Sequence, residues 1–328
     1  MGLSFLSLFI FFLLHLAPTL GGNYTNAPSY LSPPDGLDYE YYRRTCPNME
    51  AIIQNKVKQW IKKDRTLAAG LLRLHFHDCA IRGCDASILL KQAGSEKSAK
   101  ASQTLRGFEV IDDIKAALEA KCPKTVSCAD ILTAAAREAT TEIGGPYWHL
   151  KYGRRDGRTS LAREAEYIPA GHESVTNLIE LFQSKGLTVL DLVVLSGAHT
   201  IGKCNCRTIQ WRLFNYTGNG KADPSINAQY LNFLKRKCQR ATEYTYLDAT
   251  TPMVFDNSYY KNILKGMGLL STDQLLYKDS RTGPIVKALA SQGNLFYQQF
   301  GVSMVKLSKT QVLTKNEGEV RIKCSAVN

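Results

Sequence analysis

One apolar segment carries an unusual set of charged and polar side chains. Residues 71–87 read LLRLHFHDCAIRGCDAS, and within 71–78 leucines and a phenylalanine alternate with an arginine, two histidines and an aspartate. Burying such groups costs free energy unless each of them has a partner. The segment therefore has to fold against partners, and its polar groups are candidates for chemistry.

Two of these polar groups share one face of a helix. In a helix, Arg73 and His77 lie four residues apart and face the same way, whereas His75 points away from both. A cation beside an imidazole favours the neutral ring, so His77 is predicted to accept a proton near neutral pH. Arg73 is placed to stabilise negative charge as it develops. The alternative is that His77 is a hydrogen-bonded core histidine.

The loop that follows offers oxygen ligands for a metal ion. Asp78, Asp85 and Ser87 supply side-chain oxygens, and Ile81 and Gly83 supply backbone carbonyls. Hard oxygen donors on a tight loop suit Ca²⁺ better than zinc or a redox metal. A solvated acidic turn explains the same spacing equally well.

The start of the chain and its cysteines predict a secreted protein. Residues 2–16 are apolar and are followed by small and turn-forming residues, so residues 1–22 are predicted to be a secretory signal peptide and 23–38 a flexible leader. Nine cysteines in a secreted chain predict a disulfide framework with one thiol left over, and their spacing leaves the pairing open. Glycosylation sequons begin at Asn23 and Asn215. No later stretch is long and apolar enough for a membrane helix.

The remaining pattern is mainly helical and cationic. Apolar residues recur at helical spacing from Met49 onward, and the Ser127 and Thr188 positions resemble helix caps that open 128–140 and 189–196. The net charge of +12 is spread along the chain without a dense basic run or a nucleic-acid motif. This distribution favours attraction to acidic polysaccharide over nucleic-acid binding.

A second chemical segment surrounds His199. This histidine ends an apolar run on a predicted helix, in the sequence LVVLSGAHTIG at 192–202. A neutral imidazole is the ordinary axial ligand of haem iron, and such a ligand needs a carboxylate partner. Asp273 lies in another mainly apolar context and is the best candidate for that partner. A satisfied core histidine and a purely structural Asp–His pair are the alternatives.

Several blocks of sequence, taken together, resemble one known family. They are LRLHFHDC at 72–79, GCDAS at 83–87, LRGFEVID at 105–112, VSCADIL at 126–132, GRRDG at 153–157, LSGAHTIG at 195–202 and FDNSYY at 255–260. In this order they are highly specific, and from about residue 38 to 324 the chain resembles the secretory plant haem peroxidases, known as class III.

The resemblance implies an all-α fold of about ten helices in two lobes, distal and proximal, with haem b (protohaem) between them and two Ca²⁺ ions. It places this domain at residues 39–324, before a short tail at 325–328. It also implies four disulfides, which would join Cys46 to Cys122, Cys79 to Cys84, Cys128 to Cys324 and Cys206 to Cys238.

Site residues are carried over from the same resemblance. His199 matches the iron ligand, Asp273 its carboxylate partner, His77 the distal base, Arg73 the distal arginine and Phe76 a haem-pocket residue. The distal Ca²⁺ ligands match Asp78, Ile81, Gly83, Asp85 and Ser87, and the proximal ones match Thr200, Asp248, Thr251, Val254 and Asp256. The carbonyl of Pro169 matches the group that helps to hold a phenolic donor.

The implied function is reduction of H₂O₂ with oxidation of phenolic donors in one-electron steps, by a monomer in the cell wall. Two other functions are compatible with parts of this pattern. A zinc hydrolase built on His75, His77, Asp78 and a cysteine fails because a helix points the two histidines apart and no HExxH motif is present. A catalytically weak, cationic wall-binding glycoprotein on the same fold is the other rival.

The chain departs from the family pattern at three places. The family has an asparagine before the LRGF block that orients the distal histidine, but residues 97–105 contain none, leaving Gln103, a serine or a backbone carbonyl as substitutes. Cys204 is an additional cysteine that is expected to be a free thiol, an intermolecular link or a competitor for Cys238. Residues 80–82 read Ala-Ile-Arg, where an aromatic residue followed by Val-Asn is commoner.

Overall fold

Helices dominate the computed structural model, which describes residues 36–328. The predicted signal peptide at 1–22 and nearly all of the predicted leader at 23–38 lie outside the described residues. The α-helices are α1 (Met49–Lys63), α2 (Leu67–Ile81), α3 (Phe108–Glu119), α4 (Cys128–Glu142), α5 (Val175–Ser184), α6 (Val189–Ser196), α7 (Cys206–Phe214), α8 (Ala228–Lys237), α9 (Ser258–Leu264), α10 (Ser271–Lys278), α11 (Gly283–Ser291) and α12 (Gly293–Leu307).

Shorter elements complete the described chain. Two three-residue strands, β1 (Lys203–Asn205) and β2 (Tyr244–Tyr246), pair antiparallel. The 3₁₀ helices are η1 (Ser87–Leu89), η2 (Glu96–Ser98), η3 (Lys100–Ser102), η4 (Ala162–Tyr167), η5 (Gly197–Thr200) and η6 (Tyr216–Gly218). The predicted all-α class is confirmed, with twelve α-helices in residues 36–328 where about ten were expected. None of the helices in this range is both long and apolar enough to cross a membrane.

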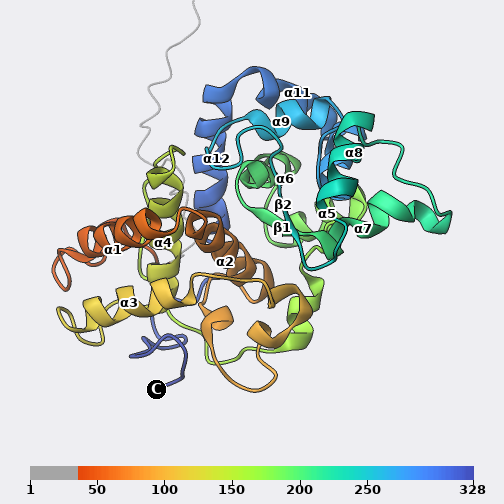
Figure 1. The fold of residues 1–328 in the computed structure, drawn as a ribbon. Helices are drawn as coiled ribbons and strands as arrows, with labels where there is room; N and C mark the ends of the chain where they lie inside the picture. Colours follow the sequence, from red (N-terminus) through yellow and green to blue (C-terminus); the bar gives the residue numbers. More distant parts are fainter. Residues whose placement is uncertain (1–35) are drawn as a thin grey trace, which may run out of the picture. The chain divides into compact units, whose positions relative to one another are not determined.

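The helices fall into two groups that contact mainly their own members (Figure 1). In the first group α4 packs against α1, α2 and α3, and in the second α6 packs against α5, α11 and α12. Ring contacts join the groups, since Phe76 of α2 stacks on Phe182 of α5 and Trp148 lies edge-on to Phe300 of α12. The chain after α12 also returns to the first group, where Cys84 N donates to the Thr310 carbonyl.

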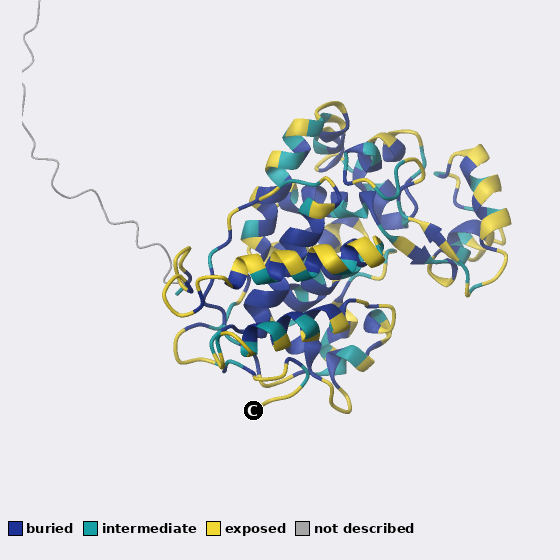
Figure 2. Ribbon diagram, turned by 60° about the vertical axis from the view of Figure 1, so that its left-hand side comes forward, coloured by how far each residue is buried: buried dark blue, intermediate teal, exposed yellow. Residues whose placement is uncertain are grey.

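Helix α4 is almost entirely buried, because residues 128–140 all lie in the interior, where Figure 2 shows dark-blue helices. Its Ser127 cap is confirmed, with the hydroxyl accepting from Asp130 N. Thr133 and Thr140 satisfy their hydroxyls by donating to the carbonyls of Ala129 and Ala136 one turn earlier. This local bonding lets polar side chains occupy a helix with no solvated face.

Local signals also set the ends of α6. Thr188 and Asp191 form a complete capping box, and the helix ends at Ser196 as the sequence predicted. The prediction that His199 continues a helix is wrong in detail, because His199 lies in the separate 3₁₀ turn η5. Gly197 permits this turn: a Cβ there would lie 2.6 Å from the Phe296 ring.

Four disulfides crosslink the described chain. They join Cys46 to Cys122, Cys79 to Cys84, Cys128 to Cys324 and Cys206 to Cys238, which are the four pairs that the resemblance implies. Cys204 is a buried free thiol in β1. It therefore neither competes for Cys238 in this structure nor presents an accessible sulfur for a link between chains.

The carboxylate of Asp130 is the polar centre of the first group. It accepts hydrogen bonds from the Tyr42 hydroxyl at 2.8 Å, from Gly153 N at 2.7 Å and from Arg154 Nη1 at 2.8 Å. Both members of the Arg154–Asp130 ion pair are fully buried. A buried charge that loses its partner is strongly destabilising, so this pair constrains how α4 meets the loop at 150–157.

We therefore expect Asp130→Ala to lower the free energy of unfolding by about 3–5 kcal/mol, because it leaves Arg154 buried and unpaired. Glu40→Ala, which removes only the exposed Arg43–Glu40 pair, is the matched control and is expected to cost about 1 kcal/mol or less. Urea denaturation followed by circular dichroism measures both. Equal losses in the two variants would contradict the assigned role of Asp130.

Candidate active site

Helix α2 separates its two histidines as the sequence predicted. His75 packs with Nδ1 3.6 Å from the sulfur of Cys79, whereas His77 is buried one turn after Arg73. His75, Cys79 and Cys84 are close enough to suggest a metal site, but both sulfurs are joined in a disulfide and are not available as thiolates. This observation removes the remaining support for a zinc centre on α2.

His77 is held as a neutral base. Burial, followed by the positive charge of Arg73, lowers the pKa of His77 to about 3. Its Nδ1 atom has no hydrogen-bond partner among the described residues. The departure from the family pattern before the LRGF block is therefore visible as an unpaired nitrogen, since no residue of 97–105 takes the place of the asparagine. The Ser102 hydroxyl, in the same segment, is also buried without a partner among these residues.

Arg73 is exposed and anchored to that segment. Its Nη1 donates to Thr104 Oγ1 at 2.8 Å, and its Nη2 donates to the Ala101 carbonyl at 3.0 Å. The charge of Arg73 acts on both candidate histidines, because it contributes to lowering the pKa of His77 and opposes protonation of His199. Arg73 therefore lies within electrostatic range of His77, on its own helix, and of His199, on η5.

His199 is oriented by a buried carboxylate. Its Nδ1 lies 2.8 Å from Asp273 Oδ1, so in the neutral ring this nitrogen carries the proton and Nε2 is the electron-pair donor. Burial lowers the pKa of His199, but the charge and hydrogen bond of Asp273 outweigh this effect and the net pKa is raised. Asp273 Oδ2 accepts from Leu270 N at the start of α10. The His199 side chain is 37% exposed, which leaves one edge of the ring accessible to a ligand.

This geometry fits a haem iron. A neutral imidazole with a carboxylate on Nδ1 and an accessible opposite edge is the donor that haem proteins use. Sequence reasoning missed a third member of the group, Tyr259 of α9, whose hydroxyl donates to Asp273 Oδ1 at 2.9 Å. The FDNSYY block contains this tyrosine, but nothing in the sequence indicates which buried acid it contacts.

The expected distal calcium loop gathers buried acids. Asp78 accepts from Ala86 N at 2.9 Å, and Asp85 accepts from Ser87 N at 2.9 Å. Burial and the nearby charges of Asp85 and Glu96 raise the pKa of Asp78 well above its usual range. Burial raises the pKa of Glu96 to about 8. Carboxylic groups held so close together need a cation to ionise together, which fits Ca²⁺.

Glu96 was not in the predicted ligand set. It is fully buried, its Oε2 lies 3.3 Å from Ser87 Oγ, and its Oε1 has no partner among the described residues. Gly83 and Gly157 allow the loop to close, since Gly83 has a φ of +110° and a Cβ at Gly157 would clash with the Asp85 carboxylate.

The expected proximal calcium ligands also converge. Thr200 Oγ1 lies 3.4 Å from Asp248 Oδ2 and 3.3 Å from Asp256 Oδ1, while Thr251 Oγ1 lies 3.1 Å from Asp256 Oδ1. Val254 N bonds to the Thr251 carbonyl, which turns this loop toward the same acids. Carboxylate, hydroxyl and carbonyl oxygens are again the donors that Ca²⁺ prefers.

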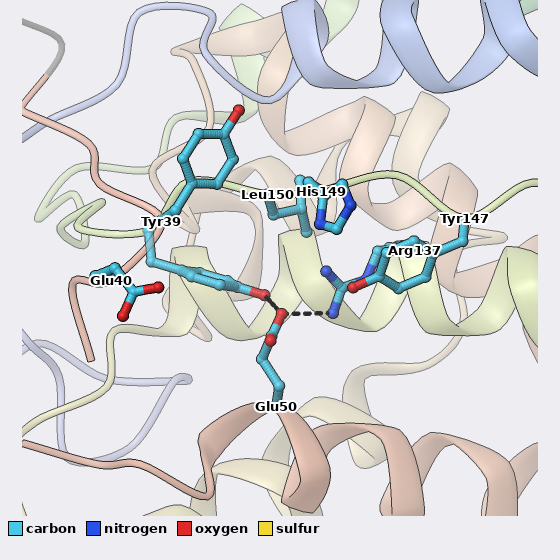
Figure 3. A pocket seen from close by; sticks show the side chains of 8 residues that line it. Tyr39, Glu40, Glu50, Arg137, Tyr147, His149 and Leu150 are labelled. Atoms are coloured by element: carbon cyan, nitrogen blue, oxygen red, sulfur yellow. Dashed lines mark hydrogen bonds and ion pairs between the residues drawn. The ribbon is translucent and has the colours of Figure 1, made fainter. Parts of the chain in front are cut away.

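Two further features are Pro169 and a cavity in the first group of helices. Pro169 follows η4 and is partly exposed. A cavity of about 450 Å³ near α1 and α4 contains none of the candidate site residues (Figure 3). Its Arg137 is paired with Glu50 and Glu138 and lies under the Tyr147 ring, an arrangement that is structural.

Because His77 has its pKa lowered to about 3, we expect its function as a base to be constant from pH 8 to pH 5 and to fall only as the pH approaches that value. Arg73→Leu removes a charge that lowers this pKa, so the acid limb should move to higher pH. Arg73→Lys keeps the charge and is the control. Stopped-flow rates with H₂O₂ across pH measure this, and an acid limb near pH 6.5 in the unmodified protein would contradict it.

Comparisons with known proteins identify the family of this chain. A family model described as peroxidase matches residues 53–292. The chain is 54% identical over 312 residues to Peroxidase 7 of Arabidopsis thaliana, covering 94% of this chain and 89% of that protein. It is 45% identical over 296 residues to Peroxidase 25 of the same plant, covering 88% and 90%. The chain therefore belongs to the class III family of plant haem peroxidases.

Proposed function

We propose that His77, Arg73, His199 and Asp273 form the active site through which this peroxidase reduces H₂O₂ and oxidises phenolic donors. Membership of the family implies a haem cofactor and H₂O₂ with a reducing donor as substrates. The observation that supports the residue assignment best is the 2.8 Å contact of His199 with buried Asp273, in electrostatic range of Arg73. The weakly active wall-binding alternative is not favoured, because all four side chains are present. His77 is held neutral, and His199 is oriented by Asp273.

Haem, if held by His199, would supply the redox chemistry that couples two-electron reduction of the peroxide to one-electron oxidation of two donor molecules. Neutral His77 removes a proton from H₂O₂ and delivers it to the departing oxygen, which leaves as water. Arg73 stabilises the charge that separates across the O–O bond. Asp273 holds the His199 proton on Nδ1, which leaves Nε2 as the atom that would hold the haem iron and would make the ring a stronger donor.

The remaining assignments are part of the same proposal. Residues 39–324 form the peroxidase domain, with the α1–α4 group as its distal lobe and the α5–α12 group as its proximal lobe. Phe76 contributes to the haem pocket, where its ring lies beside His77 and Phe182. The Pro169 carbonyl helps to hold the phenolic donor. The two clusters of oxygen donors bind one Ca²⁺ each, and Glu96 assists the distal site.

We also propose that the protein is a secreted monomer of the cell wall. The four disulfides fit an oxidising compartment. The net charge of +12 favours attraction to acidic wall polysaccharide. Cross-linking of wall phenolics and removal of H₂O₂ are the activities that this location would serve.

The direct test is stopped-flow absorbance of the haem-loaded protein mixed with H₂O₂ and then with guaiacol. His77→Ala is expected to keep the haem band and to slow the peroxide reaction by about 10²–10⁴-fold, because the proton transfer loses its base. His172→Ala changes an exposed histidine outside the site and is the matched control. A His77→Ala rate equal to that of the control would refute the assignment.

Removal of calcium provides a second test. At free Ca²⁺ a hundred times the dissociation constant, each site adds about 2.7 kcal/mol to the free energy of unfolding. We expect a chelator to lower the melting temperature of the unmodified protein, and Asp78→Asn to reduce that effect. Asp113→Asn, which changes a carboxylate bonded to Lys56 and Trp60, should respond to the chelator as the unmodified protein does. A melting temperature that the chelator leaves unchanged would exclude bound calcium.

A further inference from the structure

One oxygen atom of Asp273 has two donors. The ring nitrogen Nδ1 of His199 lies 2.8 Å from Oδ1, and the hydroxyl of Tyr259 lies 2.9 Å from the same atom. The other carboxylate oxygen, Oδ2, is bonded to Leu270 N. The tyrosine therefore competes with the histidine for charge on a single oxygen, instead of bonding to the second oxygen of the carboxylate.

The surroundings make this competition strong. Tyr259 is 3% exposed and Asp273 is 2% exposed, so bulk water does not compete with the Tyr259 hydroxyl for the carboxylate. Hydrogen bonds to an ionised carboxylate are strengthened by a low local dielectric. Burial and the charge of Asp273 hold the pKa of Tyr259 well above its usual value, so the phenol keeps its proton and stays a donor.

The position of the phenol is fixed by packing. The Tyr259 ring lies edge-on to His199 with centroids 6.1 Å apart, and edge-on to Tyr260 with centroids 4.9 Å apart. Both tyrosines belong to α9, which contacts η5 and α10. The hydroxyl that contacts Asp273 therefore comes from α9, whereas the histidine lies in η5 and the aspartate in α10.

We propose that Tyr259 is a positioning residue that limits how strongly Asp273 pulls on the His199 proton, and thereby sets the electron donation of His199 to the iron. This inference rests on the proposed role of His199 as the iron ligand. A second donor on Oδ1 withdraws negative charge from that oxygen, which weakens its hold on the His199 N–H. The imidazole is then less anionic and donates less electron density through Nε2.

Tyr259→Phe removes the hydroxyl and keeps the ring. In the haem-loaded protein we expect the equilibrium between ferric and ferrous haem to shift several-fold toward ferric, where a tenfold shift equals about 59 mV for one electron. The iron–histidine stretching frequency of the ferrous protein, measured by resonance Raman, should rise. Placing 3-fluorotyrosine at position 259 provides a more acidic donor and should move both quantities in the opposite direction.

Tyr260→Phe is the matched control. Tyr260 is equally buried and neighbours Tyr259, but its hydroxyl donates to the carbonyls of Val193 and Val194 and not to Asp273. It should change stability without moving the potential or the stretching frequency. If Tyr259→Phe matches the unmodified protein in both readouts, Tyr259 only packs and the inference is overturned.

A further variant distinguishes an error in the proposed function from an error in the role of Tyr259. His199→Ala in the haem-loaded protein should abolish the iron–histidine stretching band. If that band persists, His199 is not the iron ligand and the proposed function is wrong, along with any inference built on it. If the band is lost in His199→Ala but is unmoved in Tyr259→Phe, the function stands and only the role of Tyr259 is rejected.

Discussion

The arrangement of the second group of helices depends on the hydrogen bonds to the buried carboxylate of Asp273. A charge in a region that excludes water is tolerated only with full hydrogen bonding. Asp273 obtains this from His199 in η5, Tyr259 in α9 and the backbone of its own helix at Leu270. Three elements are thereby fixed around one side chain, and the accessible edge of His199 is a consequence of that arrangement.

In the first group of helices, Asp130 is the buried carboxylate that needs full hydrogen bonding. Its carboxylate receives donors from Tyr42, Gly153 and Arg154, while the Arg154 Nε donates to the Ser308 carbonyl beyond α12. The Cys128–Cys324 disulfide makes a second connection between α4 and the end of the chain. Helix α2 therefore lies against a rigid partner in α4, which is what a helix carrying Arg73 and His77 needs if their positions are to be maintained.

The departures from the family pattern have distinct physical outcomes. The absent asparagine leaves His77 Nδ1 without a partner among the described residues, so burial and Arg73 alone set the basicity of this ring. Cys204 has its pKa raised to about 11 by burial. A thiol in that state is largely protonated and unreactive at neutral pH. Under the proposed function, the first departure bears on peroxide activation, whereas the second leaves the disulfide framework intact.

The sequence by itself determined the helical class, the caps of α4 and α6, and the shared face of Arg73 and His77, because each depends on residues within one or two turns. It also predicted the pairing of His199 with Asp273, although only as one of several interpretations. Tertiary structure decided what lies between distant segments: Tyr259 on Asp273, Glu96 beside Asp78, and the 3₁₀ turn that carries His199. These contacts depend on how helices pack, and the local hydrogen-bonding pattern of a chain does not encode which buried donor meets which buried acid.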